Sequence, residues 1–199
     1  YFASYAQALS QTALPDVLPA PGEPAYTIAL DYRITANTAD TLSVLLVSQD
    51  NYPKGSCQRG RMQRQRLIHR ASYVVVRDLA GRVCVQLRAA DKHFYPGGWD
   101  LAAGGVMRPN ETVGENLSRE LSEEVGVQRQ FSRWQWFFFT NPHHQVWGAL
   151  ASVVVCPQAV SLSDEVVAIE WLPGRDALLL PDATPDTRHA LSLLLSSSS

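Results

Sequence analysis

The sequence predicts an α/β fold in which a mixed β-sheet lies between helices, an α/β/α sandwich. The first reason is the order of elements, because β-prone runs alternate with helical segments along most of the chain. The second is size, since 199 residues, of which 46% are hydrophobic, suit one compact domain with a real core. The third is an amphipathic helix near the middle, whose apolar stripe suits packing on a sheet.

Residues 1–40 differ in composition from the rest of the chain. The stretch "LPDVLPAPGEP" holds four of the twelve prolines, which precludes a continuous helix or a central strand. Forty residues also bury too little surface to form a core of their own. We therefore expect residues 1–40 to be an N-terminal arm that packs on the main domain or on a partner, and residues 41–199 to be that domain.

The elements of the main domain follow from local patterns. Residues 50–55 have the composition of a turn, and "LAG" at 79–81 is expected to join two strands as a hairpin. Thr184 and Pro185 suit the N-cap and first position of a last helix. Strands are expected at 41–48, 72–78, 83–88, 99–105, 134–140, 146–156 and 166–172. Helices are expected at 59–70, 112–125, 173–180 and 184–195.

The helix at 112–125 presents two chemically different faces. Its apolar face is formed by Val113, Leu117, Leu121 and Val125, which repeat every four residues. Glu120, Glu123 and Glu124 are spaced i, i+3, i+4 and crowd onto another face, where their charges repel. A hard divalent cation is the natural compensation, because Mg²⁺ and Mn²⁺ prefer oxygen ligands and recruit phosphates. The glycines before the helix allow close backbone approach, so the Gly104 carbonyl is a candidate fourth ligand.

The spacing of these residues is more specific than that of a solvated acidic face. Five glutamates and two arginines lie in "GGVMRPNETVGENLSRELSEEVGV", with glycines at both ends. From Gly105 to Val127 the pattern is G, five residues, E, seven residues, then R-E-hydrophobic-x-E-E-x-G-hydrophobic. This segment resembles the signature of the Nudix superfamily without a departure, and the resemblance extends over roughly residues 41–196.

The resemblance implies a Nudix fold and a hydrolase that depends on Mg²⁺ or Mn²⁺. It implies metal ligands at Glu120, Glu123, Glu124 and Gly104. It also assigns supporting roles to Arg119 and Glu111. A carboxylate is expected to take the proton of the attacking water, and Glu120 and Glu165 are both candidates for this general base. The sequence leaves the choice between them open.

Segments outside this signature resemble the branch of Nudix proteins related to isopentenyl-diphosphate isomerase, and most of all its YfcD-type members. They include "RLIHRASYVVV", "VQLRAADKHFYPGGWDLAAGGV" and "DEVVAIEWL". By this resemblance Arg88 and Lys92 match residues that hold a diphosphate, which suits a guanidinium fork and an ammonium group. The isomerase has Cys-Gly-His where this chain has Gly104-Gly105-Val106, so its protonating cysteine and a metal-binding histidine are missing.

Two further residues are candidates for contact with the substrate. Trp99 offers an aromatic face for stacking. Arg70 closes the segment "RGRMQRQRLIHR", which holds five arginines and is interpreted as a solvated helix with Arg70 or His69 near the pocket. The adjacent histidines His143 and His144 are interpreted as part of a surface loop.

The composition of the chain limits the classes of ligand and partner that are expected. The net charge of −2 and the absence of aromatic residues among the clustered arginines argue against nucleic acid as a ligand. The longest apolar runs fall far short of a membrane span. The three cysteines are widely separated and are interpreted as reduced core thiols of an intracellular protein. A small diphosphate is the expected ligand, and residues 1–40 are a candidate contact for a homodimer or a larger assembly.

The function that follows is hydrolysis of a diphosphate linkage in a small nucleoside-diphosphate-type molecule. An alternative from another class is a catalytically silent subunit or binding module that docks through residues 1–40. A weaker alternative is an activity like that of isopentenyl-diphosphate isomerase. The complete set of mutually repelling glutamates favours the hydrolase, because a silent site has no physical need for them.

Overall fold

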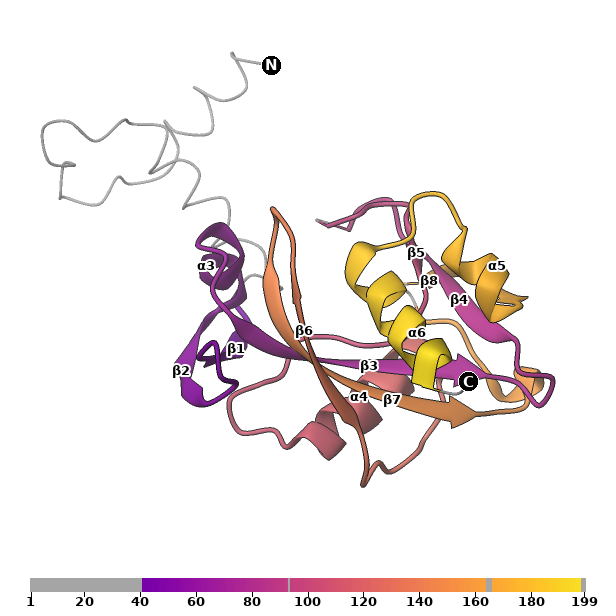
Figure 1. Ribbon diagram of the computed structural model, residues 1–199, viewed down its shortest axis with the longest axis horizontal. Coiled ribbons are helices and arrows are strands. Elements are labelled where there is room, and N and C mark those ends of the chain that lie inside the picture. Colours follow the sequence, from indigo (N-terminus) through magenta and orange to yellow (C-terminus); the bar gives the residue numbers. More distant parts are fainter. Residues whose placement is uncertain (1–40, 93, 164–165, 198–199) are drawn as a thin grey trace, which may run out of the picture. The chain divides into compact units, whose positions relative to one another are not determined.

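A computed structural model describes residues 41–92, 94–163 and 166–197. These residues form a mixed sheet of eight strands with helices on both faces, which confirms the predicted α/β sandwich (Figure 1). The predicted arm at 1–40 and the candidate base Glu165 lie outside the described residues. The division of the chain at residue 41 therefore stays a prediction.

Strand β3 organises the sheet. It runs parallel to β7 over nine residue pairs, from His69–Val146 to Arg77–Val154. On the far side of β7, β6 continues the sheet in the antiparallel sense, and β1 and β2 extend it from the other edge of β3. The strands are β1 Ser43–Val47, β2 Pro53–Gln58, β3 His69–Arg77, β4 Val83–Arg88, β5 Trp99–Asp100, β6 Gln135–Thr140, β7 Gln145–Val154 and β8 Val166–Leu172.

The predicted hairpin between β3 and β4 is confirmed at its turn, where Arg77 pairs with Val83. Beyond this pair the two strands separate. The segment after β5 lies along β3 instead, with antiparallel bridges from Val74 to Ala103 and from Ala71 to Val106. Strand β4 pairs with β5 on one side and with β8 on the other. The divergence brings residues 103–106, including the two glycines, against the middle of the sheet.

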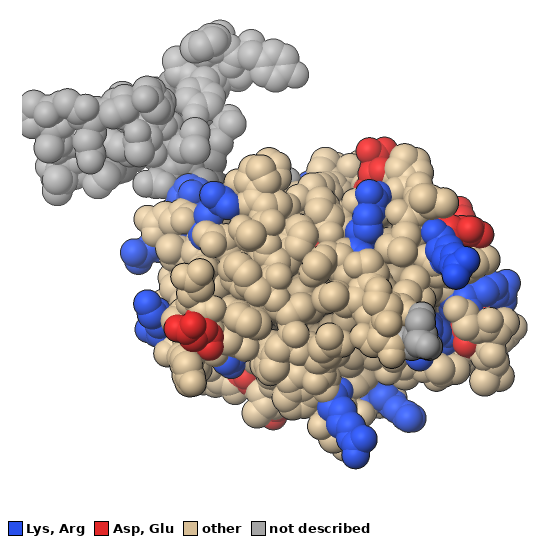
Figure 2. Space-filling view, viewed as in Figure 1, with Lys and Arg blue, Asp and Glu red and all other residues tan. Residues whose placement is uncertain are grey.

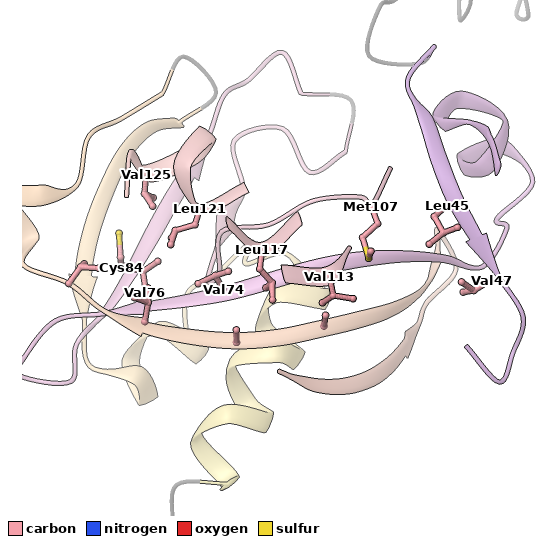
Figure 3. Packing of buried hydrophobic residues seen from close by; sticks show 14 residues of the cluster. Leu45, Val47, Val74, Val76, Cys84, Met107, Val113, Leu117, Leu121 and Val125 are labelled. Atoms are coloured by element: carbon pink, nitrogen blue, oxygen red, sulfur yellow. The ribbon is translucent and has the colours of Figure 1, made fainter. Parts of the chain in front are cut away.

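Two helices cover opposite faces of the sheet. Figure 3 shows side chains of α4 (Val113–Val125) pointing onto β3 and β7, while α6 crosses the other face. The alternation of β3 explains this division, because Val74 and Val76 join the core under α4 and Tyr73 and Val75 join the core under α6. The helices are α3 Arg59–Arg64, α4 Val113–Val125, α5 Gly174–Leu178 and α6 Pro185–Ser197, with a 3₁₀ turn at Pro157–Ala159.

Helix α4 begins and ends where its sequence dictates. Thr112 is the N-cap of a capping box in which its side chain accepts from the Glu115 N–H and the Glu115 carboxylate accepts from the Thr112 N–H. Gly126 ends the helix in the left-handed conformation, with φ 71°. Between these ends the predicted apolar stripe is buried, and Leu117 and Leu121 are fully inaccessible. The helix therefore has a fixed register against the sheet, which sets where its glutamates point.

Three local predictions need correction. Residues 53–58, partly predicted as a turn, form the edge strand β2, and Pro53 is its first residue, a position where proline fits easily. The arginine-rich helix ends at Arg64 rather than residue 70, because His69 already pairs in β3. Cys156 is exposed, so of the three free cysteines only Cys84 is a buried core thiol.

The surface adds two observations. Figure 2 shows the face that bears α6 with charged side chains gathered at its margins and a middle that is neither acidic nor basic. Among the helices that the structure describes, none combines the length and the hydrophobicity needed to cross a membrane.

Candidate active site

Two glycines let the backbone at 104–105 approach both β3 and α4 unusually closely. A β-carbon on Gly104 would lie 1.9 Å from the Ser72 carbonyl oxygen of β3. A β-carbon on Gly105 would lie 2.6 Å from a carboxylate oxygen of Glu120 on α4. Both distances are shorter than real contacts of a β-carbon, so side chains larger than hydrogen are excluded from these positions without a shift of the neighbour.

Glu120 and Glu124 are the carboxylates that face this glycine pair. Glu120 is 9% exposed and ion-paired with Arg119 at 2.8 Å. Glu124 accepts hydrogen bonds from the Gly104 N–H at 3.2 Å and from the Gln86 amide at 3.3 Å. Burial raises the pKa of Glu120 to about 7. Burial, together with repulsion from Asp100 and Glu120, raises the pKa of Glu124 well above its usual range.

Arg119 connects the acidic residues of the predicted signature. Its guanidinium holds Glu111 in a bidentate ion pair, at 2.6 and 3.1 Å, and contacts Glu123 at 2.9 Å. Burial opposes ionisation of Glu111, but hydrogen bonds from Arg119, the Arg108 N–H and Asn116 hold its pKa below the usual value. The structure thus places Arg119 and Glu111 as the support of the loop before α4.

The donor set at Gly104 suits a divalent cation. The described residues contain no group of three or more His, Cys, Asp or Glu side chains arranged around one point. Glu123 points outward, with its side chain 53% exposed, toward Arg119 and Arg108. The buried Glu120 and the half-buried Glu124, however, repel each other, and no described residue donates a hydrogen bond to the Gly104 carbonyl. A cation held by these three groups would relieve that repulsion and use the free carbonyl.

The glycine pair also forms part of the lining of a cavity of about 150 Å³ on the α6 side of the sheet. Strand β3, helix α3, the start of α6 and the end of β4 also contribute to the lining. Arg88 lies in this lining and pairs with Asp100 at 2.5 Å, and it also donates to the Phe94 carbonyl at 3.1 Å. Burial raises the pKa of Asp100, and the charge of Arg88 opposes that rise. The cavity therefore places a fixed guanidinium next to the candidate cation site.

The other residues predicted to bind substrate do not line this cavity. Lys92 follows β4 and its N–H donates to the Ala89 carbonyl. Trp99 packs against the core under α6, and its backbone bonds to Asp182 and Thr184. Arg70 points to the opposite face of β3, where it donates to the Asn51 side chain at 2.8 Å and lies 5.1 Å from the Trp136 ring. The cavity thus brings together Arg88, Gly104 and His69, the residue predicted near the pocket as the alternative to Arg70.

The sequence interpretation missed the polar part of the cavity lining around Asp186. The Tyr73 hydroxyl donates to Asp186 at 2.8 Å, and the Nε2 atom of His144 lies 3.7 Å from the same carboxylate. His144, interpreted as part of a surface loop, is partly buried in the cavity lining together with His69. Tyr73 and Asp186 are 113 residues apart, so no local spacing connects them. The one available signal was the position of Asp186 in the first turn of the last helix.

Comparison with known sequences supports the resemblance. Residues 67–194 match the model of the NUDIX domain. An uncharacterized Nudix hydrolase, YfcD of Salmonella typhi, is 39% identical over 157 residues, which cover 78% of this chain and 85% of that protein. The isopentenyl-diphosphate Delta-isomerase of Burkholderia multivorans is 37% identical over 83 residues, which cover only 42% of this chain and 47% of that enzyme.

Solved structures show the same fold at low sequence identity. DR0079 from Deinococcus radiodurans superposes with a TM-score of 0.61 at 18% identity, over 75% of this chain and 97% of that one. The MutT protein from Methanosarcina mazei Go1 superposes with a TM-score of 0.59 at 21% identity, over 66% of this chain and 96% of that one. These likenesses extend the match from the sequence signature to the arrangement of strands and helices.

Proposed function

The chain belongs to the Nudix hydrolase family, and from that premise we propose that it hydrolyses a diphosphate linkage in a small nucleoside-diphosphate-type molecule with the help of Mg²⁺ or Mn²⁺. One observation carries this proposal. Two mutually repelling carboxylates, the buried Glu120 and the half-buried Glu124, lie against the Gly104–Gly105 backbone, which also lines the cavity. A catalytically silent module gains nothing from this arrangement, because it costs stability without a cation.

The proposed roles of the site residues follow from their positions. Glu120, Glu124 and the Gly104 carbonyl would hold the cation, which would offset the charge of the diphosphate and acidify a water molecule. Glu123 remains a proposed ligand, although its carboxylate now pairs with Arg119. Arg88 would bind phosphate oxygens, and Asp100 holds its guanidinium in place. Arg119 orients Glu111 and Glu120 through charge-assisted hydrogen bonds.

The general base is proposed to be Glu120. Its carboxylate is held between the Arg119 guanidinium and the Gly105 backbone, so its orientation is fixed before substrate binds. Glu165, the alternative base, lies outside the described residues. Separate Glu120→Gln and Glu165→Gln variants discriminate between them, because loss of the base lowers kcat more than it raises KM.

Isomerisation of an isoprenoid diphosphate fits the site less well. By the resemblance, an isomerase needs a cysteine at position 104, yet any β-carbon there would lie 1.9 Å from the Ser72 carbonyl oxygen. The close approach of β3 therefore has to relax before this site accepts the isomerase residue. The partial match to the Burkholderia enzyme is consistent with shared ancestry of the fold rather than of the chemistry.

Product release from a panel of diphosphates tests the proposal. The panel contains nucleoside diphosphates, nucleotide sugars, dinucleotides and prenyl diphosphates, each with Mg²⁺, with Mn²⁺ and with a chelator. We expect turnover of at least one compound that stops with the chelator and falls by roughly 100-fold or more in Glu124→Gln. The amide is close in shape to the carboxylate, so the variant should stay folded.

A matched control separates the site from a general effect of charge. Glu170 lies on β8 and is exposed, so Glu170→Gln removes one glutamate without touching the cavity. We expect wild-type turnover from this variant. Turnover of no compound by the wild-type chain, or equal turnover by the Glu124→Gln chain, would overturn the proposed function.

A further inference from the structure

The cavity beside Gly104 carries opposite charges that nearly cancel. Arg88 is paired with Asp100 at 2.5 Å, so these two groups add no net charge. The two other charged residues of the lining are Arg59 and Asp186, and both act electrostatically on His69. A cationic group would be repelled by Arg59, and an anionic group would be repelled by Asp186. This balance of charges in the lining favours a ligand group that is neutral and polar.

The wall of the cavity that includes Asp186 and His69 is rich in hydrogen-bond acceptors. Asp186 receives one hydrogen bond, from the Tyr73 hydroxyl at 2.8 Å, and a carboxylate accepts several. His69 is neutral at pH 7, because burial lowers its pKa to about 4. Its Nδ1 atom lies 3.2 Å from the Leu67 carbonyl, which only accepts, so Nδ1 carries the proton and Nε2 is a second acceptor. Two acceptors on one wall suit a ligand that presents several hydroxyl groups.

This wall is fixed before any ligand binds. Thr184 donates to Asp100 at 2.6 Å and lies 2.5 Å from the Thr187 hydroxyl, which joins the first turn of α6 to β5. Thr187 in turn accepts from the Leu101 N–H at 3.1 Å. Because Asp186 lies between these two threonines in sequence, its position relative to Arg88 is set by the same network.

The size and the remaining walls suit one ring. A cavity of about 150 Å³ is comparable to one that holds benzene. Met62, Phe94 and Tyr95 supply apolar surface to the lining, with the two aromatic rings 6.5 Å apart. A sugar ring has C–H faces for such a surface and hydroxyl groups at its edge for the acceptors.

We propose that this cavity receives one sugar ring of the substrate, with Asp186 as the principal acceptor for its hydroxyl groups and Tyr73 as the residue that positions Asp186. The inference rests on the proposed function in one respect, since it places the diphosphate beside Gly104 and Arg88. It excludes isoprenoid diphosphates as the preferred substrates, because a hydrocarbon chain would cover Asp186 and His69 without replacing their hydrogen bonds to water.

Binding measurements test the subsite independently of turnover. Saturation-transfer NMR with ADP-ribose, UDP-glucose and dimethylallyl diphosphate, in the presence of a chelator, reports which ligand protons touch the protein. Titrations give the dissociation constants for the wild-type chain and for two variants. Asp186→Asn keeps an acceptor for Tyr73 but removes the charge. Asp182→Asn is the matched control, because Asp182 is exposed, precedes the same helix and has a φ of 54° that asparagine tolerates.

We expect saturation of sugar-ring protons, weaker binding of dimethylallyl diphosphate, and a loss of affinity for the sugar-linked ligands of roughly 10- to 100-fold in Asp186→Asn. Asp182→Asn should bind as the wild-type chain does. Tyr73→Phe should weaken binding less than Asp186→Asn, because it frees the carboxylate without removing it.

The outcomes separate this inference from the proposed function. Binding of a sugar-linked ligand that depends on Asp186, without hydrolysis of any diphosphate, supports the subsite and overturns the hydrolase. Hydrolysis confined to prenyl diphosphates, or sugar-linked binding unchanged by Asp186→Asn, supports the hydrolase and overturns the subsite. Absence of binding by every ligand overturns the subsite.

Discussion

Gly104 and Gly105 are neighbours, yet an added methyl group meets a different obstacle at each. At Gly104 it meets the backbone of β3, 1.9 Å from the Ser72 carbonyl oxygen. At Gly105 it meets the carboxylate of the Glu120 side chain, 2.6 Å away. Backbone in a paired strand is hard to displace, whereas the Glu120 carboxylate can be pushed from its ion pair with Arg119 without movement of the backbone. A substitution at Gly104 should therefore disturb the fold, whereas a substitution at Gly105 should disturb the position of a side chain of the proposed active site.

We predict that Gly105→Ala stays folded but loses activity, by roughly 10- to 100-fold, because Glu120 is pushed from its place. Gly104→Ala should instead lower the melting temperature markedly, since a strand of the core has to move. Thermal unfolding and product release measured on both variants check this. Equal melting temperatures for the two variants would show that β3 accommodates a methyl group at position 104.

His69 gives a pH dependence of stability whose sign follows from burial. Its pKa falls from 6.5 in the unfolded chain to about 4 in the folded one, so the unfolded chain binds more protons between these values. Its contribution is fully present above pH 6.5 and is lost as the pH falls toward 4. The difference amounts to about 3 kcal/mol in the free energy of unfolding.

The prediction is tested by urea unfolding of the wild-type chain and of His69→Gln at pH 7.0, 5.5 and 4.5. The wild-type free energy of unfolding should fall more steeply with decreasing pH than that of the variant, which has no imidazole to protonate. Parallel curves for the two chains would mean that His69 accepts a proton in the folded state as readily as in the unfolded chain.

At the scale of one element, helix α4 depends on its first turn. The Thr112 hydroxyl accepts from the Glu115 N–H at 3.3 Å, and the Glu115 carboxylate accepts from the Thr112 N–H at 2.8 Å. We expect Thr112→Ala to lower the free energy of unfolding by about 1 kcal/mol, because one N–H of the first turn loses its partner. Thr112→Ser keeps the hydroxyl and should restore most of that stability. Denaturant unfolding of the three chains measures the difference, and equal losses in both variants would contradict the capping role.

Helix α4 was also the element most accessible from sequence. Its stripe of Val113, Leu117, Leu121 and Val125 was predicted from a local pattern, and the structure confirms it. The N-cap Thr112 and the terminal Gly126 are local signals as well. Which of its glutamates face the glycine pair at 104–105 was less predictable from the sequence. Glu123 lies toward solvent with Arg119, because the register that buries Leu117 and Leu121 turns only Glu120 and Glu124 toward the glycine pair.

At the scale of the whole molecule, the sheet separates two cores. Leu117 is fully buried between α4 and the sheet, and Leu191 is fully buried between α6 and the opposite face. We predict that Leu117→Ala and Leu191→Ala each lower the free energy of unfolding by about 2–5 kcal/mol. The effects should add in the double variant, because the two side chains share no contact across the sheet.

Denaturant unfolding monitored by tryptophan fluorescence and by circular dichroism checks this pair. The two signals should change together in every variant, since both cores share the central strand β3. Separate transitions for the two signals would show that the two cores do not unfold as one cooperative unit. A double variant whose loss of unfolding free energy departs from the sum of the single losses by more than about 1 kcal/mol would show that the two side chains interact across the sheet.

Contacts between segments far apart in the sequence could not be predicted from the sequence alone. The order of strands and helices predicts an α/β sandwich, but it does not reveal that residues 103–106 fill the edge of β3 that β4 leaves free. Tyr73, His144 and Asp186 meet only because β3, the loop before β7 and α6 converge on one cavity. Trp99 and Arg70 were predicted at this site because of their chemistry, and the strand alternation points them elsewhere.

We propose that Glu120, Glu124 and the Gly104 carbonyl form a cation site. Calorimetric titration of the chain with Mn²⁺ tests this site without knowledge of the substrate. We expect saturable binding to the wild-type chain and to Glu170→Gln, with affinity lowered by roughly 10-fold or more in Glu120→Gln and in Glu124→Gln. Mn²⁺ binding that is absent from the wild-type chain, or that is unchanged in both site variants, would show that these groups do not form a cation site.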